Sequence, residues 1–294
     1  MRRATVALIA AGLGACIGHV ATAADLPPAP PPARAHKAPV VVAAYSWAGF
    51  YVGFNAGGAW GRSHLTTATV FSAPGYFTAD SVAVVNAAGD QSSTANGFTG
   101  GIQAGFNVQS GALVAGIEAE LDYFGLRGSS SGSGVFPCCA PAGFTITSSV
   151  KTDWLATIRG RLGVASGNWL FYVTGGAAFT NLKGDFAYTD NCFFVPACFG
   201  TGGPSVIEAV SFSNTKTGYA VGGGVEAGLW GNWSFKAEYL YVDFGSVSAV
   251  GVISTPAAIA VGAANNPFTH SLDLKAHIAR LGVNYRFGPV VAAY

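Results

Sequence analysis

Hydrophobic and polar residues alternate with a period of two in eight stretches of this chain. In one of them, Phe98, Ile102 and Phe106 fall on one face, whereas Gln103 and Asn107 fall on the other. A period of two is the mark of a β-strand whose two faces meet different surroundings. The pattern therefore predicts eight strands, over residues 47–60, 97–109, 112–124, 150–164, 169–179, 219–229, 233–241 and 277–287.

The connections between these strands alternate between short and long. Tight hairpin turns are expected at residues 110–111, 166–168 and 231–232, and long connections near 62–96, 127–149, 184–213 and 247–270. An even number of strands with this asymmetry is typical of outer-membrane barrels. We predict an all-β fold, an eight-stranded antiparallel transmembrane β-barrel with short periplasmic turns and four long extracellular loops.

A soluble β-sandwich or a lipocalin-like barrel is the alternative, and it would bury the apolar face inside. The polar face argues against it, because closely spaced opposite charges and many glycines suit a narrow, filled lumen. Aromatic residues favour the membrane barrel, because they collect at both ends of the apolar face, as interfacial girdles do. The inner end holds Phe50, Phe106, Trp169, Phe171, Trp233, Phe235, Tyr285 and Phe287, and the outer end holds Trp60, Phe98, Tyr123, Trp154, Phe179, Tyr219 and Tyr241.

Composition narrows the class further. Only 10% of the residues are charged and 50% are hydrophobic, which suits neither a solvated globule nor a disordered chain. A net charge of +1 provides no basic field that would attract nucleic acid. No apolar run of about 18 residues, the length of a spanning helix, follows the N-terminal region. Such a chain is expected to cross a membrane as strands.

The N-terminal region has the pattern of an export signal. Two arginines precede an apolar stretch, and residues 21–23 provide a small-x-small cleavage site. We predict a signal peptide over residues 1–23, a Pro/Ala-rich periplasmic lead-in over 24–46, the barrel over 47–287 and a short tail over 288–294. A lipobox-like sequence around Cys16 is the alternative, in which Cys16 would carry lipid.

The charged residues on the predicted lumen face balance by count, with six acids and six bases. Charges in so narrow a space are expected to pair, because an unpaired buried ion is costly. We predict a salt-bridged plug, and a gated ion path is the alternative. The predicted network comprises Glu118, Glu120, Asp122, Lys151, Asp153, Arg159, Arg161, Glu226, Lys236, Glu238, Arg280 and Arg286.

Four cysteines follow the predicted cleavage site. Cys138 and Cys139 lie in the second long connection, and Cys192 and Cys198 lie in the third. An even number in an oxidising compartment indicates disulfides. Cys192 with Cys198 is the favoured pair. A bond between the two connections is the alternative to pairing of the adjacent Cys138 and Cys139. Neither connection contains a histidine, so we predict no metal site.

No catalytic constellation stands out in the sequence. His270, beside Ser271, lies near the outer rim, and His277 lies on the outward face, where a lipid hydrolase would need a histidine. No acid is clearly placed to orient either histidine. We therefore predict no enzyme activity and no cofactor.

Three segments near the ends of the chain resemble a known family. Ala-Asp-Leu-Pro at 24–27, Trp-Ala-Gly-Phe-Tyr-Val-Gly at 47–53 and Arg-Leu-Gly-Val-Asn-Tyr-Arg-Phe at 280–287 are similar to small Gram-negative outer-membrane β-barrel proteins of the porin family, OmpA-like and opacity-like. The resemblance implies an abundant envelope and surface antigen. It also implies that Gly282, Tyr285 and Phe287 form the C-terminal assembly signal, although such a signal often ends the chain and here a tail follows.

Together these patterns predict an exported outer-membrane β-barrel, with periplasmic termini and a structural or surface-interaction role in the cell envelope. Its predicted partners are outer-membrane lipid, the barrel-insertion machinery during assembly and an extracellular ligand at the loops, but not nucleic acid. A narrow porin-like channel for small solutes is one alternative function, and an outer-membrane lipid-modifying enzyme is another. The sequence identifies neither a surface ligand nor an oligomeric state.

Overall fold

A computed structural model describes residues 45–200, 202–203 and 205–288 of the 294-residue chain. The predicted signal peptide, Cys16, the lead-in up to residue 44 and tail residues 289–294 lie outside the described residues. No helix in the described part of the chain is both long and apolar enough to cross a membrane.

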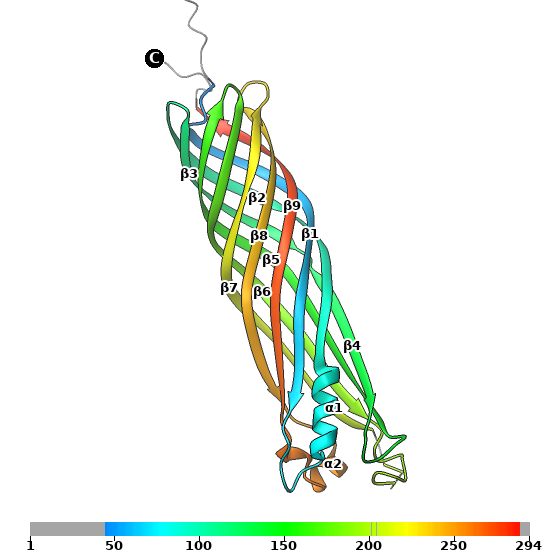
Figure 1. The fold of residues 1–294 in the computed structure, drawn as a ribbon. Coiled ribbons are helices and arrows are strands. Elements are labelled where there is room, and N and C mark those ends of the chain that lie inside the picture. The colour runs from blue at the N-terminus through cyan, green and yellow to red at the C-terminus, as the bar shows by residue number, and fades with distance from the viewer. Residues whose placement is uncertain (1–44, 201, 204, 289–294) are drawn as a thin grey trace, which may run out of the picture. The chain divides into compact units, whose positions relative to one another are not determined.

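Nine antiparallel strands form one closed sheet within the described residues (Figure 1). They are β1 (Gly49–Thr69), β2 (Asp90–Ser110), β3 (Leu113–Phe124), β4 (Arg127–Val135), β5 (Gly143–Ser166), β6 (Trp169–Asp190), β7 (Val206–Gly228), β8 (Trp233–Gly251) and β9 (Phe268–Phe287). Because β3 and β4 both pair with β5, they act as one barrel strand with a short interruption. β9 closes the ring by pairing with β1. The ring has eight strand positions, which confirms the predicted eight-stranded antiparallel barrel.

The predicted tight turns connect β2 to β3, β5 to β6 and β7 to β8. Gly111 and Gly167 occupy the left-handed region, each with φ near 59°. A residue with a side chain adopts this conformation only at a cost, so glycine permits the abrupt reversal that a hairpin needs.

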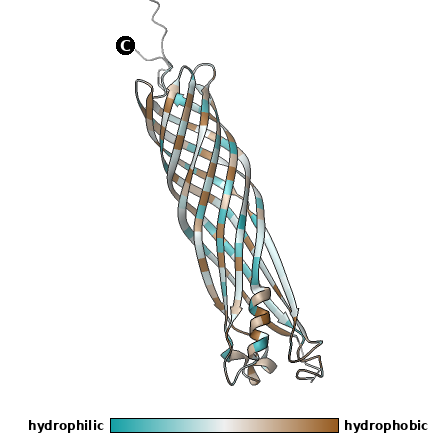
Figure 2. Ribbon diagram, viewed as in Figure 1, coloured by the Kyte–Doolittle hydropathy of each residue, from teal (hydrophilic) through white to brown (hydrophobic). Residues whose placement is uncertain are grey.

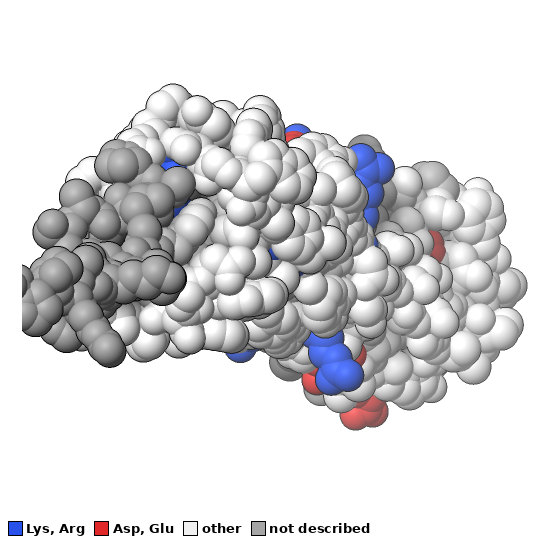
Figure 3. All heavy atoms as spheres, turned by 90° about the horizontal axis from the view of Figure 1, so that it is seen from above, with Lys and Arg blue, Asp and Glu red and all other residues white. Residues whose placement is uncertain are grey.

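β6 shows how one strand crosses two environments. Its even-numbered residues point inward along the whole strand, from Leu170 to Asp190. On the outer face, the apolar residues up to Phe179 give way to Asn181, Lys183 and Asp185. This change places the end of the apolar surface at Phe179, because lipid requires an apolar face and water does not. Figure 2 shows hydrophobic and hydrophilic residues alternating along the strands, and the visible surface in Figure 3 is mostly uncharged.

The long connections are shorter than predicted, because the strands continue outward beyond the apolar band. The segments outside the strands are residues 70–89, 136–142, 191–205 and 252–267. The first contains helix α1 (Ala79–Gly89), and the last contains α2 (Pro256–Ala260) and the 3-10 helix η1 (Ala263–Asn265). The outward face of these extensions carries mostly polar or small residues, such as Thr145, Thr147 and Lys151 of β5, so it lacks the apolar signal on which the prediction depended. The barrel therefore projects a stalk of paired strands beyond the membrane.

Two register shifts interrupt the ladders. One lies between Thr152 and Leu155 of β5, and the other lies between Asp243 and Ser246 of β8. A β-bulge adds a residue to one strand and so reverses which later side chains face inward. In β5 the even-numbered residues face the interior before the shift, and the odd-numbered residues face it afterwards.

Candidate functional site

The interior of the membrane-spanning part holds a cluster of charged residues that the strand register brings face to face. Glu118 of β3 lies directly opposite Arg159 of β5, and Glu238 of β8 lies opposite Arg280 of β9. All four side chains are buried. Opposite charges at facing positions stabilise a ladder, and here they also neutralise one another inside a narrow lumen.

Arg280 joins three carboxylates at the centre of this cluster. Its Nη1 lies 2.9 Å from Asp122, its Nε lies 2.9 Å from Glu238, and its Nη2 lies 2.5 Å from Glu120. Arg159 uses one nitrogen to reach Glu118 at 2.9 Å and Glu120 at 2.6 Å. Because each arginine is shared, the groups form one network rather than separate pairs.

Lys236 and Arg161 extend the network toward the periplasmic side. The Lys236 Nζ lies 3.0 Å from Glu118 and 3.5 Å from Glu120. Arg161 lies 2.9 Å from Glu226, and its guanidinium stacks 4.1 Å from the centre of the Tyr172 ring. Such contacts compensate the loss of hydration that a buried charge suffers.

Arg286, also predicted in the network, lies nearer the periplasmic mouth. It stacks 4.6 Å from the centre of the Trp47 ring and donates a hydrogen bond of 2.5 Å to the Ser46 carbonyl. Trp47 itself is fully buried among Val114, Leu170 and Tyr172. The segment before β1 thus caps the inner end of the lumen.

The prediction that Lys151 and Asp153 face the lumen is wrong. Lys151 pairs with Asp185 at 3.7 Å, and Asp153 pairs with Lys183 at 2.5 Å; these side chains are roughly half exposed. The register shift in β5 is the cause, because it reverses the inward face for the residues before Leu155. The remaining ten predicted charges are all buried: Glu118, Glu120, Asp122, Arg159, Arg161, Glu226, Lys236, Glu238, Arg280 and Arg286.

Neutral side chains complete the network, and sequence analysis missed them. The Tyr51 hydroxyl donates to Glu118 at 2.7 Å, and Asn55 donates to Asp122 at 3.0 Å. Asn284 donates to Glu226 at 2.9 Å. Asn55 and Asn284 lie on the polar faces of their strands, so the period of two could have identified them; Tyr51 is amphipathic and gives no such signal.

Beyond the ionic network the lumen changes character and becomes an apolar core. Buried residues of this outer seal include Leu65, Phe124, Leu182, Phe186 and Leu272, which come from strands around the ring. The prediction considered polar filling alone. It missed the seal because Leu65, Leu182, Phe186 and Leu272 lie in or beside segments assigned to loops, and because Phe124 is the last residue of a predicted strand.

His270 lies inside this outer part of the barrel rather than at an exposed rim. Its Nδ1 lies 2.9 Å from the Thr67 hydroxyl, and its Nε2 lies 3.2 Å from Glu208. The histidine and Glu208 are fully buried. Glu208 is the acid that sequence analysis did not find, because β8 separates its strand from β9. His277 faces outward, where its ring stacks 6.1 Å from Trp60.

The predicted assembly residues lie at the end of β9. The Tyr285 ring is 5.1 Å from Trp233, and the Phe287 ring is 5.6 Å from Phe50. All four aromatic residues belong to the inner girdle, which an interface between lipid and water favours. Gly282 faces the lumen, where an added Cβ would lie 3.3 Å from the Gln103 amide nitrogen.

A second core holds the extracellular connections together. Its carboxylate, Asp190, accepts hydrogen bonds from Tyr76 at 2.9 Å, from Tyr188 at 2.7 Å and from the Cys192 N–H at 3.0 Å. Burial raises the pKa of the Asp190 carboxyl, although these three hydrogen bonds oppose the shift. Cys139, Cys192 and Cys198 pack in the same core, and the four cysteines form the bonds Cys138–Cys139 and Cys192–Cys198.

A closed ring of strands, apolar outside between two aromatic girdles and charged inside, defines a transmembrane β-barrel. The chain belongs to the outer membrane protein beta-barrel domain family, whose model matches residues 32–287. It is 31% identical over 282 residues to the 31 kDa outer-membrane immunogenic protein of Brucella melitensis biotype 1, covering 95% of this chain and 99% of that protein. The protein is thus located in the bacterial outer membrane.

Two further proteins are similar to this chain. The 22 kDa outer membrane protein of Rhizobium leguminosarum bv. viciae is 30% identical over 150 residues, which cover 51% of this chain and 54% of that protein. Among solved structures, the outer membrane protein OprG from Pseudomonas aeruginosa has a TM-score of 0.37 and 12% identity, and the match covers 82% of this chain and 97% of that one.

Proposed function

We propose that this outer-membrane barrel has a closed lumen and a structural and surface-interaction role, without enzyme activity. The observation that carries the closed lumen is the filling of the interior at three successive levels. Trp47 caps the inner end, the ionic network around Arg280 follows, and the apolar seal around Phe186 comes last. An ion would have to pass the apolar seal without water, which is costly.

Conductance in planar bilayers tests the closed lumen. The wild-type protein is expected to give no steady conductance. Glu120→Gln alone should leave it closed, because the apolar seal lies in series with the network. Phe124→Gly combined with Phe186→Gly should make it conduct, whereas the matched lipid-facing change Phe54→Gly should not. Steady conductance in the wild type would instead support the narrow pore, in which Glu120→Gln would mainly change ion preference.

We propose that the protein has no enzyme activity because His270 is buried. Thr67, His270 and Glu208 form a hydrogen-bonded chain, but His270 and Glu208 have no exposed surface that a lipid could reach. We therefore assign the trio a packing role inside the stalk. Incubation of the purified barrel with lipid A and with phospholipid should give no hydrolysis product. Product that disappears in His270→Asn would contradict this proposal.

The proposed surface-interaction role rests on the uncharged, partly apolar residues of the extracellular connections. Residues 70–78, 136–142, 191–205 and 252–267 contain no Asp, Glu, Lys or Arg. Phe71, Phe194 and Ile259 are all about half exposed there. Apolar groups exposed together at the end of a stalk favour a partner with an uncharged, apolar surface.

Partition of cells into hexadecane droplets tests this role with a defined apolar probe. Cells that display the wild-type barrel should partition more strongly than cells that display Phe71→Ser with Phe194→Ser at the same surface level. Thr147→Ser, a change on the exposed side of the stalk, should have no effect. Equal partition of all three strains would contradict the proposal.

A further inference from the structure

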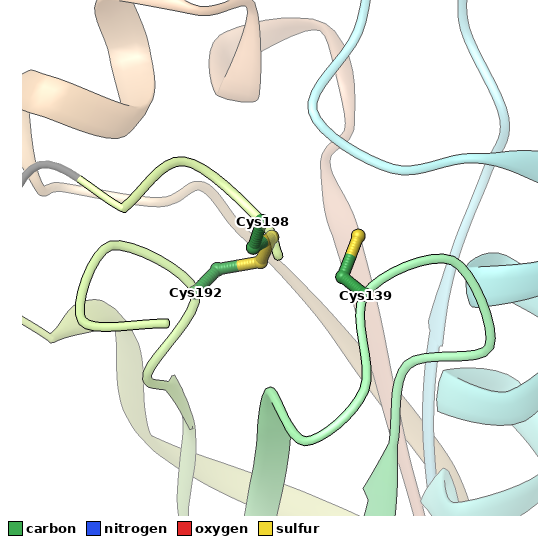
Figure 4. A group of neighbouring side chains, drawn as sticks. All are labelled: Cys139, Cys192 and Cys198. Atoms are coloured by element: carbon green, nitrogen blue, oxygen red, sulfur yellow. A yellow bond between two sulfur atoms is a disulfide. The ribbon is translucent and has the colours of Figure 1, made fainter. Parts of the chain in front are cut away.

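The four cysteines of two different connections meet at the outer end of the barrel. The Sγ atoms of Cys139, Cys192 and Cys198 all lie within 4.8 Å of one another. Figure 4 shows the Cys139 sulfur beside the Cys192–Cys198 disulfide, with each side carried by its own loop. A thiolate at Cys139 would therefore have a disulfide within reach.

The two disulfides differ in how readily a thiol can attack them. The Cα atoms of the adjacent Cys138 and Cys139 are 3.8 Å apart, as their shared peptide bond requires. Those of Cys192 and Cys198 are 5.3 Å apart, inside the usual range for a disulfide. A bond outside that range is the more easily opened of the two.

The adjacent pair is also accessible. Cys138 is exposed, whereas Cys192 is buried. A cavity of about 200 Å³ between the loops is lined by all four cysteines together with Tyr76 and Phe199. This space admits a small thiol next to the Cys138 sulfur.

We propose that these four cysteines form a thiol–disulfide exchange site, in which a small external thiol starts the exchange and is regenerated at its end. The external thiolate attacks the Cys138 sulfur, forms a mixed disulfide and releases Cys139 as a thiolate. Cys139 attacks Cys192, forms a bond between the loops and releases Cys198 as a thiolate. Cys198 attacks Cys138 in the mixed disulfide and releases the external thiolate again.

The exchange converts two bonds within loops into two bonds between loops. Electrons balance, because each step breaks one S–S bond and forms another, and the external thiolate is regenerated. No oxidant or reductant is consumed. The connection between β4 and β5 then becomes covalently tied to the connection between β6 and β7, which stiffens the outer end of the barrel.

Peptide mapping distinguishes the two arrangements. Trypsin releases residues 128–151 with Cys138 and Cys139, and residues 184–216 with Cys192 and Cys198, as separate peptides. The folded protein is incubated with substoichiometric 2-mercaptoethanol, alkylated with N-ethylmaleimide, unfolded and digested. The two peptides are expected to convert from separate species into one linked species as the major product. Peptides that stay separate would overturn the proposal.

Two single variants provide a matched control. Cys138→Ser leaves Cys139 as a free thiol beside the second disulfide, so it should give linked peptides without any added thiol. Cys139→Ser leaves only Cys138, which is not among the three sulfurs within 4.8 Å of one another, and it lacks the Cys139–Cys192 bond that first ties the loops, so it should stay unlinked. Both should retain the gel mobility of the folded barrel. Equal linkage in both variants would refute the assigned order of attack.

Discussion

Glu118 and Arg159 face each other across the β3–β5 ladder, with 2.9 Å between Glu118 Oε1 and Arg159 Nη2. Neither side chain is more than 2% exposed. The Lys236 Nζ approaches the same Glu118 oxygen to 3.0 Å, so one carboxylate oxygen contacts two cations. A carboxylate in this position couples three strands, because β8 reaches across the lumen to β3.

Removal of one partner of this pair should destabilise the barrel strongly. Glu118→Gln or Arg159→Met leaves the buried network with one charge in excess, which should cost about 3–5 kcal/mol. The double variant should cost less than the sum of the two, because the coupling is lost with the pair. Urea titration in detergent, followed by gel mobility, measures each free energy of unfolding. Additive costs would show that the pair is energetically independent.

The second prediction concerns the position of the bilayer. Ile102 lies on the outer face beside Phe54 and Leu121, at the level of the ionic network. Ile102→Arg places a charge against lipid and should cost about 2–4 kcal/mol of stability. Thr147→Arg on the outer face of the β5 extension should cost little, because that surface meets water. The free energy of folding into lipid vesicles measures both, and equal costs would contradict the assigned boundary.

The alternation of lipid-facing and lumen-facing residues, which includes Ile102 and Glu118, is sufficient to predict the closed ring. Whether a side chain faces inward or outward depends on its position within its own strand, and the sequence shows that directly. The wrong orientation of Lys151 arose because no sequence pattern marks the shift between Thr152 and Leu155. The contact between Glu208 and His270 was equally hidden, since it joins strands that are not neighbours. Such contacts depend on the radius and closure of the barrel, which strand-by-strand patterns do not contain.

The third prediction separates the assembly role of the last strand from its packing. Tyr285→Ala with Phe287→Ala should prevent insertion in cells, because these variants remove the aromatic rings that the insertion machinery is expected to recognise. Trp233→Ala with Phe50→Ala removes the facing rings of the same contacts and should permit insertion. Deletion of residues 288–294 should have a mild effect. The folded fraction in isolated outer membranes measures all three, and failure of all three would contradict a specific signal.

The fourth prediction concerns Asp190, which should make the stability of the outer end of the barrel depend on pH. Burial raises the pKa of this carboxyl above its unfolded value, so the folded state holds the proton more tightly. Its contribution is therefore complete below the unfolded pKa of about 3.9 and is lost as the pH rises through the folded pKa. Hydrogen exchange of residues 191–205, corrected for intrinsic rates, should show protection that falls over this window. Asp190→Asn should remove the fall, whereas Asp185→Asn, on the exposed face of the same strand, should retain it.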